Sequence, residues 1–143
     1  MTETVNNTLV RDAMVPDPGC LQDSATAQQA GRELSDPDVR AVLVCADGGA
    51  FVGVVTRKTL VREVVAAGLD PRETQLRGIA EPPVFTLDAE MPLDEAFHEL
   101  ESRDLERVPV VEDGRLVGIL SRAVVQRRLA EDEPPPAEAD LGD

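Results

Sequence analysis

Apolar residues in the first half of the chain follow the spacing of a helix, then that of buried strands, then that of a helix again. From Ala27 to Leu34, small and apolar residues recur at positions i, i+3, i+4 and i+7, which share one helix face. Two valine-rich runs follow, AVLVC (41–45) and FVGVV (51–55), and helical spacing returns between Leu60 and Val65. The pattern predicts a unit with the order strand, helix, strand, strand, helix.

The same order recurs 65 to 66 residues further along the chain. Val39–Val61 aligns with Leu105–Gln126 at a shift of 66 residues, which falls to 65 after Gly49 because the first loop has one extra residue. Upstream, Val10–Met14 matches Leu76–Ala80, again at a shift of 66 residues. We therefore expect two copies of one structural unit.

Helix caps and turns support these predicted elements. Thr26, with Gln29 three residues later, fits a capping box, and Pro92 at the matching place in the second copy suits a first helical turn. An Asp-Gly pair separates the two valine-rich runs in each copy, at 47–48 and at 113–114. Because glycine adopts positive φ without steric cost, each pair predicts a β-hairpin.

Composition and charge narrow the functional classes. The 143 residues include 28 acidic and 14 basic side chains, for a formal net charge of −14. Such a surface repels phosphate backbones and anionic lipid, so we expect no nucleic-acid binding. We also expect no signal peptide, because the first ten residues lack a basic start and an apolar core. We expect no membrane insertion, because no apolar run approaches the roughly 20 residues of a membrane helix. The predicted location is the cytoplasm.

Cysteine content and the last residues add two expectations. Cys20 and Cys45 are the only cysteines, and in a reducing cytosol we expect two thiols rather than a disulfide. Residues 131–143 are acidic, rich in proline and free of aromatic side chains. Because this segment offers little apolar surface to offset the entropy of ordering, we expect a disordered tail.

The ordered repeat resembles a tandem CBS-domain pair, also called a Bateman module. The segments that carry the resemblance are VRDAM, VLVCADGGAFVGVVTR and RVPVVEDGRLVGILSR. The expected divisions are an N-terminal segment (1–9), the first repeat (10–68), a linker (69–75), the second repeat (76–130) and the tail (131–143). The resemblance implies an α+β fold in which the two repeats pack sheet to sheet with pseudo-twofold symmetry.

The resemblance also implies a regulatory role. In CBS-domain pairs, two clefts between the repeats bind adenosine-containing ligands, so AMP, ADP, ATP or S-adenosylmethionine is the expected ligand. Two modules often form a disc-shaped dimer, and many are appended to an enzyme, channel or transporter. For this chain we expect a homodimer and a regulated partner of unknown identity.

The candidate ligand-binding residues lie at two matching strand-to-helix corners, GVVTRKT (53–59) and GILSRAV (118–124). In each, a hydroxyl at Thr56 or Ser121 stands where the second helix begins, and Arg57 or Arg122 adds a positive charge that suits a phosphate. A simpler interpretation remains open. Thr56 and Ser121 are also common helix N-caps, and both arginines could be solvated.

The last residue of each corner departs from the family pattern. The pattern Gly-x-x-Thr/Ser-x-x-Asp ends in an acid that binds the ribose hydroxyls, but Thr59 and Val124 stand there. Losing a charged hydrogen-bond partner costs about 1.5–3 kcal/mol, about a ten- to hundredfold loss of affinity. Thr59 still offers one hydroxyl, and Arg107 could join Arg57 and Arg122 to form an anion pocket in one cleft.

We expect no catalytic activity. Glu95 and His98 have the Glu-x-x-His spacing of carboxylate-bridged metal sites, but the pair occurs once and fits an exposed polar helix face. His98 is the only histidine, so any histidine-based triad would depend on this single residue. Three functions remain to be compared: a ligand-sensing module, a ligand-free dimerisation scaffold and, with least support, an enzyme.

Overall fold

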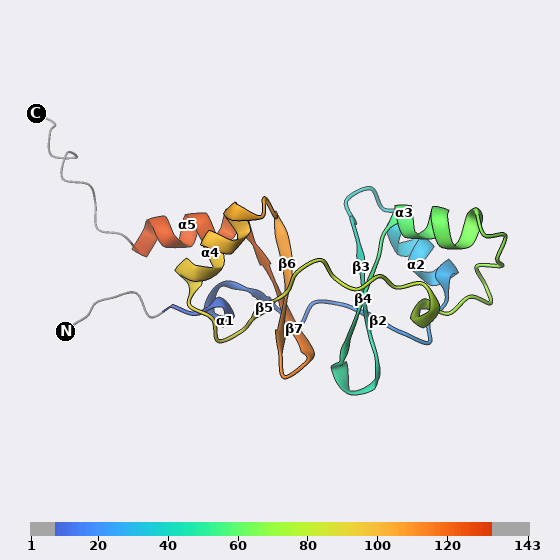
Figure 1. Ribbon diagram of the computed structural model, residues 1–143, viewed down its shortest axis with the longest axis horizontal. Coiled ribbons are helices and arrows are strands. Elements are labelled where there is room, and N and C mark those ends of the chain that lie inside the picture. Colours follow the sequence, from blue (N-terminus) through green and yellow to red (C-terminus); the bar gives the residue numbers. More distant parts are fainter. Residues whose placement is uncertain (1–7, 133–143) are drawn as a thin grey trace, which may run out of the picture.

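The computed structural model describes residues 8–132 and contains two sheets with helices on their outer sides (Figure 1). The elements of the first half are α1 (Val10–Ala13), β1 (Val15–Pro16), β2 (Leu21–Gln22), α2 (Ala27–Leu34), β3 (Val42–Cys45), η1 (Asp47–Gly49), β4 (Phe51–Val55), α3 (Arg57–Leu60) and the π-helical turn η2 (Val61–Val65). Those of the second half are η3 (Leu76–Gly78), β5 (Leu87–Asp88), α4 (Leu93–Ser102), β6 (Arg107–Glu112), β7 (Arg115–Ser121) and α5 (Arg122–Asp132). The predicted order of strand, helix, strand, strand, helix is present in both repeats.

The two sheets lie side by side in the centre of the molecule, with α2 and α3 at one outer end and α4 and α5 at the other (Figure 1). One sheet has the strand order β2-β3-β4 and the other has the order β1-β7-β6-β5. In each, the first strand of the repeat pairs in parallel with the second, and the second pairs antiparallel with the third. The predicted α+β fold with sheet-to-sheet packing is confirmed.

Both predicted hairpins are present. Asp113 (φ 53°) and Gly114 (φ 78°) form a two-residue turn between the paired residues Glu112 and Arg115. Two consecutive positive φ values are the signature of a type I′ turn, which matches the twist of the strands. The longer first loop contains the short 3₁₀ turn η1, with Gly48 at φ 81°.

The leading segments of the repeats, Val10–Val15 and Leu76–Glu81, are exchanged in space. Val10 is buried in the core of the second repeat, among residues such as Leu93 and Leu120. Leu76 and Ile79 are buried in the core of the first repeat. The sequence divisions place each segment with the repeat that follows it along the chain, whereas the structure packs it against the other one.

Polar contacts also hold each leading segment against the other repeat. The Arg11 guanidinium forms ion pairs with Glu90 and Glu112 of the second repeat. The hydrogen bond to Glu90, followed by that to Glu112, raises the pKa of Arg11. In the first repeat, Leu76 N–H donates to the Ala25 carbonyl (2.8 Å) and Arg77 N–H donates to the Asp23 carbonyl (2.9 Å). Each leading segment is therefore held by both apolar and polar contacts.

The capping box predicted at α2 is present. Gln29 N–H donates to Thr26 Oγ1 (3.2 Å), and Thr26 N–H donates to Gln29 Oε1 (2.9 Å). The Thr26→Ala variant is expected to lower the free energy of unfolding by about 1 kcal/mol, because one helix N–H loses its acceptor. Urea denaturation followed by circular dichroism measures the change. Ser24→Ala, at an exposed residue next to the cap, is the control, and equal stability of the two variants would contradict the cap's role.

The C-terminal boundary differs slightly from the prediction. Helix α5 continues through Glu131 and Asp132, which the composition had placed in the tail. The rest of the tail, residues 133–143, lies outside the described residues, as do residues 1–7 of the N-terminal segment. Within residues 8–132, no helix has the length and apolar character needed to cross a membrane.

Candidate functional site

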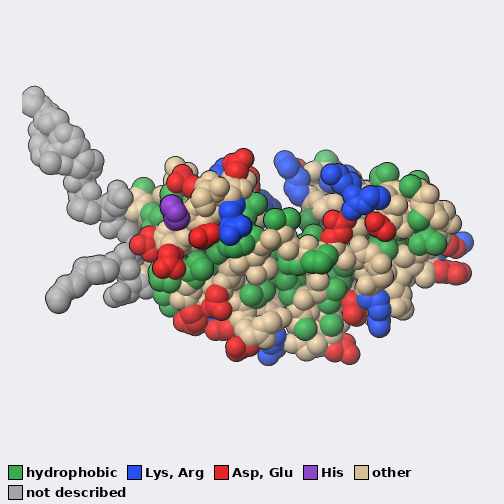
Figure 2. All heavy atoms as spheres, in the orientation of Figure 1, with side chains coloured by type: hydrophobic (Ala, Val, Ile, Leu, Met, Phe, Trp, Pro, Cys, Tyr) green, Lys and Arg blue, Asp and Glu red, His purple; other side chains and the backbone are tan. Residues whose placement is uncertain are grey.

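A groove between the two repeats is the strongest candidate for a ligand site. Its volume is about 550 Å³, within the usual range of small-molecule pockets. The groove joins a second hollow of about 720 Å³ through the shared residues Asp38, Arg40 and Arg107. Figure 2 shows the molecule hollowed between its halves, with basic side chains along the rim. The apolar wall comes from both repeats and includes Val39, Ala41, Leu43, Val54, Val108, Pro109 and Ile119.

Arg40 and Arg107 provide the positive charge of the groove. Both side chains are exposed, and within residues 8–132 neither forms a hydrogen bond or an ion pair. The acids of the same hollow are Asp38 and Glu106, and Glu106 is paired with Arg122 of α5. Two guanidinium groups therefore remain available to an anion that enters the groove.

The six residues predicted from the sequence do not all meet in this groove. Thr56 and Arg107 line it together. Arg57 instead donates a hydrogen bond to the Asp36 carbonyl (2.9 Å). Arg122 is 23% exposed and forms ion pairs with Asp104 and Glu106. The predicted convergence of three arginines on one cleft is thus limited to Arg107 in the arrangement observed here.

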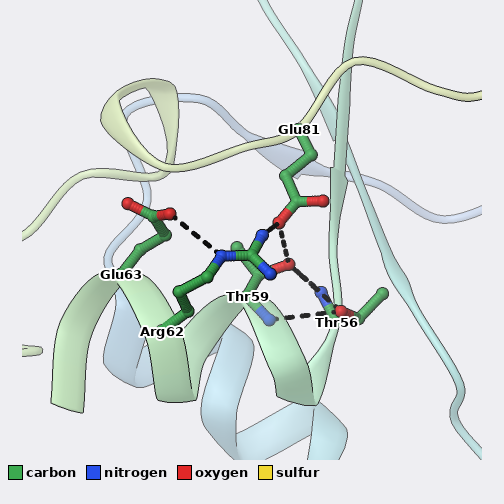
Figure 3. A network of polar contacts seen from close by, with 5 residues as sticks. All are labelled: Thr56, Thr59, Arg62, Glu63 and Glu81. Carbon is green, nitrogen blue, oxygen red and sulfur yellow. Dashed lines mark hydrogen bonds and ion pairs between the residues drawn. The ribbon is translucent and has the colours of Figure 1, made fainter. Parts of the chain in front are cut away.

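The first corner is closed by hydrogen bonds within the protein (Figure 3). Thr59 is fully buried, and its hydroxyl donates to Glu81 Oε2 (3.1 Å). Thr59 Oγ1 also accepts from Thr56 N–H (3.0 Å) and lies 3.1 Å from Thr56 Oγ1. Because a threonine hydroxyl has a single proton, Thr56 is the donor between the two hydroxyls. Thr59 therefore has no proton to offer a ligand.

The second corner has fewer polar contacts. Ser121 Oγ accepts a long hydrogen bond from Val124 N–H (3.5 Å), as expected of an N-cap. Val124 offers no polar side-chain atom, and within residues 8–132 the Ser121 hydroxyl has no other partner. The two corners share a backbone geometry but differ in the chemistry of their last residue.

One groove residue, Arg40, and one residue of the first corner, Glu81, were missed by the sequence prediction. Arg40 directly precedes the AVLVC run, a place comparable to that of Arg107 before VPVV, so its position beside a strand was a usable signal. Glu81 lies in the leading segment of the second repeat. Its contact with Thr59 could not be predicted, because it depends on the spatial exchange of the leading segments.

The remaining candidate chemistry is weaker. Glu95 and His98 are both exposed on α4, as the polar-face interpretation predicts, and residues 8–132 contain no group of three metal-binding side chains.

Cys20 and Cys45 are free thiols. Burial, and then the neighbouring Cys20, raise the pKa of Cys45 to about 12, so this thiol stays protonated and unreactive at neutral pH.

Comparisons with known proteins support the regulatory interpretation. The sequence model of the CBS domain matches residues 10–66 and 76–131. Hypoxic response protein 1 of Mycobacterium tuberculosis is 31% identical over 124 residues, which is 87% of each chain.

Solved structures show the same arrangement. A crystal structure of hypoxic response protein I with two coordinated zinc ions superposes with a TM-score of 0.68 at 30% identity, covering 84% of this chain and 98% of the other. CBSX2 in complex with AMP superposes with a TM-score of 0.67 at 24% identity, covering 88% of this chain and 98% of the other. The fold of residues 8–132 is that of these two-repeat proteins.

Proposed function

The chain belongs to the CBS-domain family, and from this premise we propose that it is a regulatory module whose groove between the repeats binds an adenosine-type nucleotide. AMP, ADP, ATP and S-adenosylmethionine are the ligands to test. The single observation that carries the proposal is a pair of arginines, Arg40 and Arg107, that have no partner within residues 8–132 and lie beside an apolar wall built from both repeats. Guanidinium groups suit a phosphate, and the apolar wall suits a base.

A ligand in this position is suited to regulation. Strand residues of the first repeat, such as Val54, and of the second, such as Ile119, line the same groove. A ligand that contacts both repeats stabilises the arrangement that fits it best, and that preference is transmitted to any surface formed by both repeats. We propose that a homodimer presents this surface to a partner protein in the cytoplasm. No catalytic role is proposed.

The Arg107→Ala and Arg40→Ala variants test the groove. Each is expected to weaken binding of AMP by about tenfold or more, because a charged hydrogen bond to the phosphate is lost. Isothermal titration calorimetry of the full chain measures the affinity. Arg127→Ala is the matched control, since Arg127 is an exposed arginine of α5 outside the groove lining. Unchanged AMP affinity in both groove variants would contradict the proposal.

A ligand-free scaffold is the second candidate, and the state of the two acid positions favours it. Thr59 is buried and internally bonded, and Val124 is apolar, so neither corner has the usual acid on its helix. This function predicts a stable dimer in sedimentation and a melting temperature that does not respond to nucleotides. A rise in melting temperature with millimolar AMP would exclude it.

A further inference from the structure

Glu81 provides a carboxylate at the corner where the first repeat lacks its acid. Resting on the function proposed above, we infer that each chain binds one adenosine-type ligand, at the corner of the first repeat, and that Glu81 accepts hydrogen bonds from the ribose hydroxyls. Thr59 and Arg62 hold this carboxylate in place and act as positioning residues. At the matching positions of the second corner, Val15 and Val124 carry no such group.

The geometry at Glu81 leaves one carboxylate oxygen available. Thr59 and Arg62 both donate to the same atom, Oε2. Within residues 8–132, Oε1 has no hydrogen bond, and Figure 3 shows it pointing away from Thr59 and Arg62. The Glu81 side chain is 40% exposed. An oxygen with two free lone pairs on an exposed carboxylate can accept hydrogen bonds from two adjacent hydroxyls.

Two hydrogen bonds fix the Glu81 backbone against β4, next to a residue that lines the groove. Glu81 N–H donates to the Val54 carbonyl, and Val54 N–H donates to the Glu81 carbonyl, both at 2.8 Å. Val54 and Thr56 line the groove, and Thr56 is linked to Glu81 through the Thr59 hydroxyl. The carboxylate is thus ordered before a ligand arrives, which reduces the entropy lost on binding.

Charge compensation makes the corner compatible with a phosphate-bearing ligand. Arg62 pairs with Glu81 and also with Glu63 at 3.3 Å. A carboxylate that is already paired with a guanidinium group repels a nearby phosphate less than an unpaired one does. The same guanidinium orients the Glu81 carboxylate, and its one other partner within residues 8–132, Glu63, is the next residue of η2.

The second repeat supplies an internal comparison. The Glu81 carbonyl lies against Gly53, and the Val15 carbonyl lies in the same way against Gly118, so Val15 matches Glu81. At the helix position, Val124 matches Thr59. Both polar members of the first corner are therefore replaced by valine in the second, while Arg127 stands at the position of Arg62. This coordinated difference indicates one binding corner per chain.

Calorimetric titration of the full chain with AMP and with 2′-deoxy-AMP tests the inference. We expect one AMP per chain and about tenfold weaker binding of 2′-deoxy-AMP, because one hydroxyl bond is lost. Glu81→Val, which introduces the residue of the second corner, should weaken AMP binding by about ten- to hundredfold and abolish the preference for AMP. The double variant Val15→Glu/Val124→Thr should bind a second AMP, whereas the control Val15→Leu/Val124→Thr, which adds no acceptor at residue 15, should not.

The outcomes separate this inference from the proposed function. Two AMP molecules per wild-type chain, or unchanged AMP affinity in Glu81→Val, would overturn the inference alone, provided that Arg107→Ala still weakens binding. Absence of nucleotide binding to the wild type would overturn both. If circular dichroism shows that Glu81→Val does not fold, the inference is tested by the AMP affinity of Glu81→Gln and by the wild-type affinities for AMP and 2′-deoxy-AMP. Equal wild-type affinity for the two nucleotides would then contradict the inference.

Discussion

Replacing Gly53 with alanine is expected to lower the free energy of unfolding by about 3 kcal/mol, the upper part of the range for overpacked sites. A Cβ atom at this buried position would lie 2.3 Å from the Glu81 carbonyl oxygen and 2.9 Å from its carbonyl carbon. These are backbone atoms, held by the two hydrogen bonds between Val54 and Glu81, so they cannot move without breaking that pairing. Urea denaturation of the purified variant measures the loss.

The repeat provides a second case and a control. At Gly118, a Cβ atom would lie 2.4 Å from Met14 Sδ and 2.9 Å from the Val15 carbonyl oxygen, so Gly118→Ala should also destabilise strongly. Gly78→Ala is the control, because no described atom beyond those of Gly78 and its chain neighbours lies within 4 Å of its Cβ position. A Gly53→Ala variant as stable as Gly78→Ala would show that the leading segment does not pack against β4 as described.

The Leu76→Ala variant is expected to lower the free energy of unfolding by about 3 kcal/mol, as is typical of a large side chain removed from a packed core. Leu76 is fully buried among residues of the first repeat, although it follows that repeat along the chain. In the Leu76→Ala variant, the increase in amide hydrogen exchange should therefore appear in β2, β3 and β4. Denaturation measures the overall loss, and hydrogen exchange followed by mass spectrometry locates it.

An exposed leucine nearby is the matched control for this core substitution. Leu69 is 48% exposed, so Leu69→Ala should change the free energy of unfolding by less than about 0.5 kcal/mol. If the faster exchange of Leu76→Ala were confined to β5, β6 and β7, the exchanged packing of the leading segments would be contradicted.

Local sequence patterns predicted the repeated unit because its determinants are local. Asp113-Gly114 specifies a turn by backbone conformation alone, and the Thr26–Gln29 capping box involves residues three apart. The glycine that begins each corner was also a usable signal, since a glycine in a strand often permits the close approach of another backbone segment. At Gly53 and Gly118, the approaching backbone is that of Glu81 and Val15.

The site was harder to predict because its chemistry depends on contacts between distant segments. The sequence placed Thr59 at the end of a ligand-binding corner, but it carried no sign that Glu81, 22 residues away, would accept a hydrogen bond from the Thr59 hydroxyl. Arg57 and Arg122 have suitable charge, yet nearby acceptors at Asp36 and Glu106 engage them. Which arginine remains unpaired is a property of the folded surface, which spacing along the chain does not encode.

A crystal structure of the full chain grown with AMP would show directly whether the groove between the repeats binds the nucleotide. We predict one AMP per chain in this groove, with its phosphate near Arg40 and Arg107. The apolar hollow of about 410 Å³ between α2 and α3, lined by residues including Ala27, Leu60 and Val64, should stay free of nucleotide. An empty groove at saturating AMP, or AMP bound only in that hollow, would contradict nucleotide binding between the repeats.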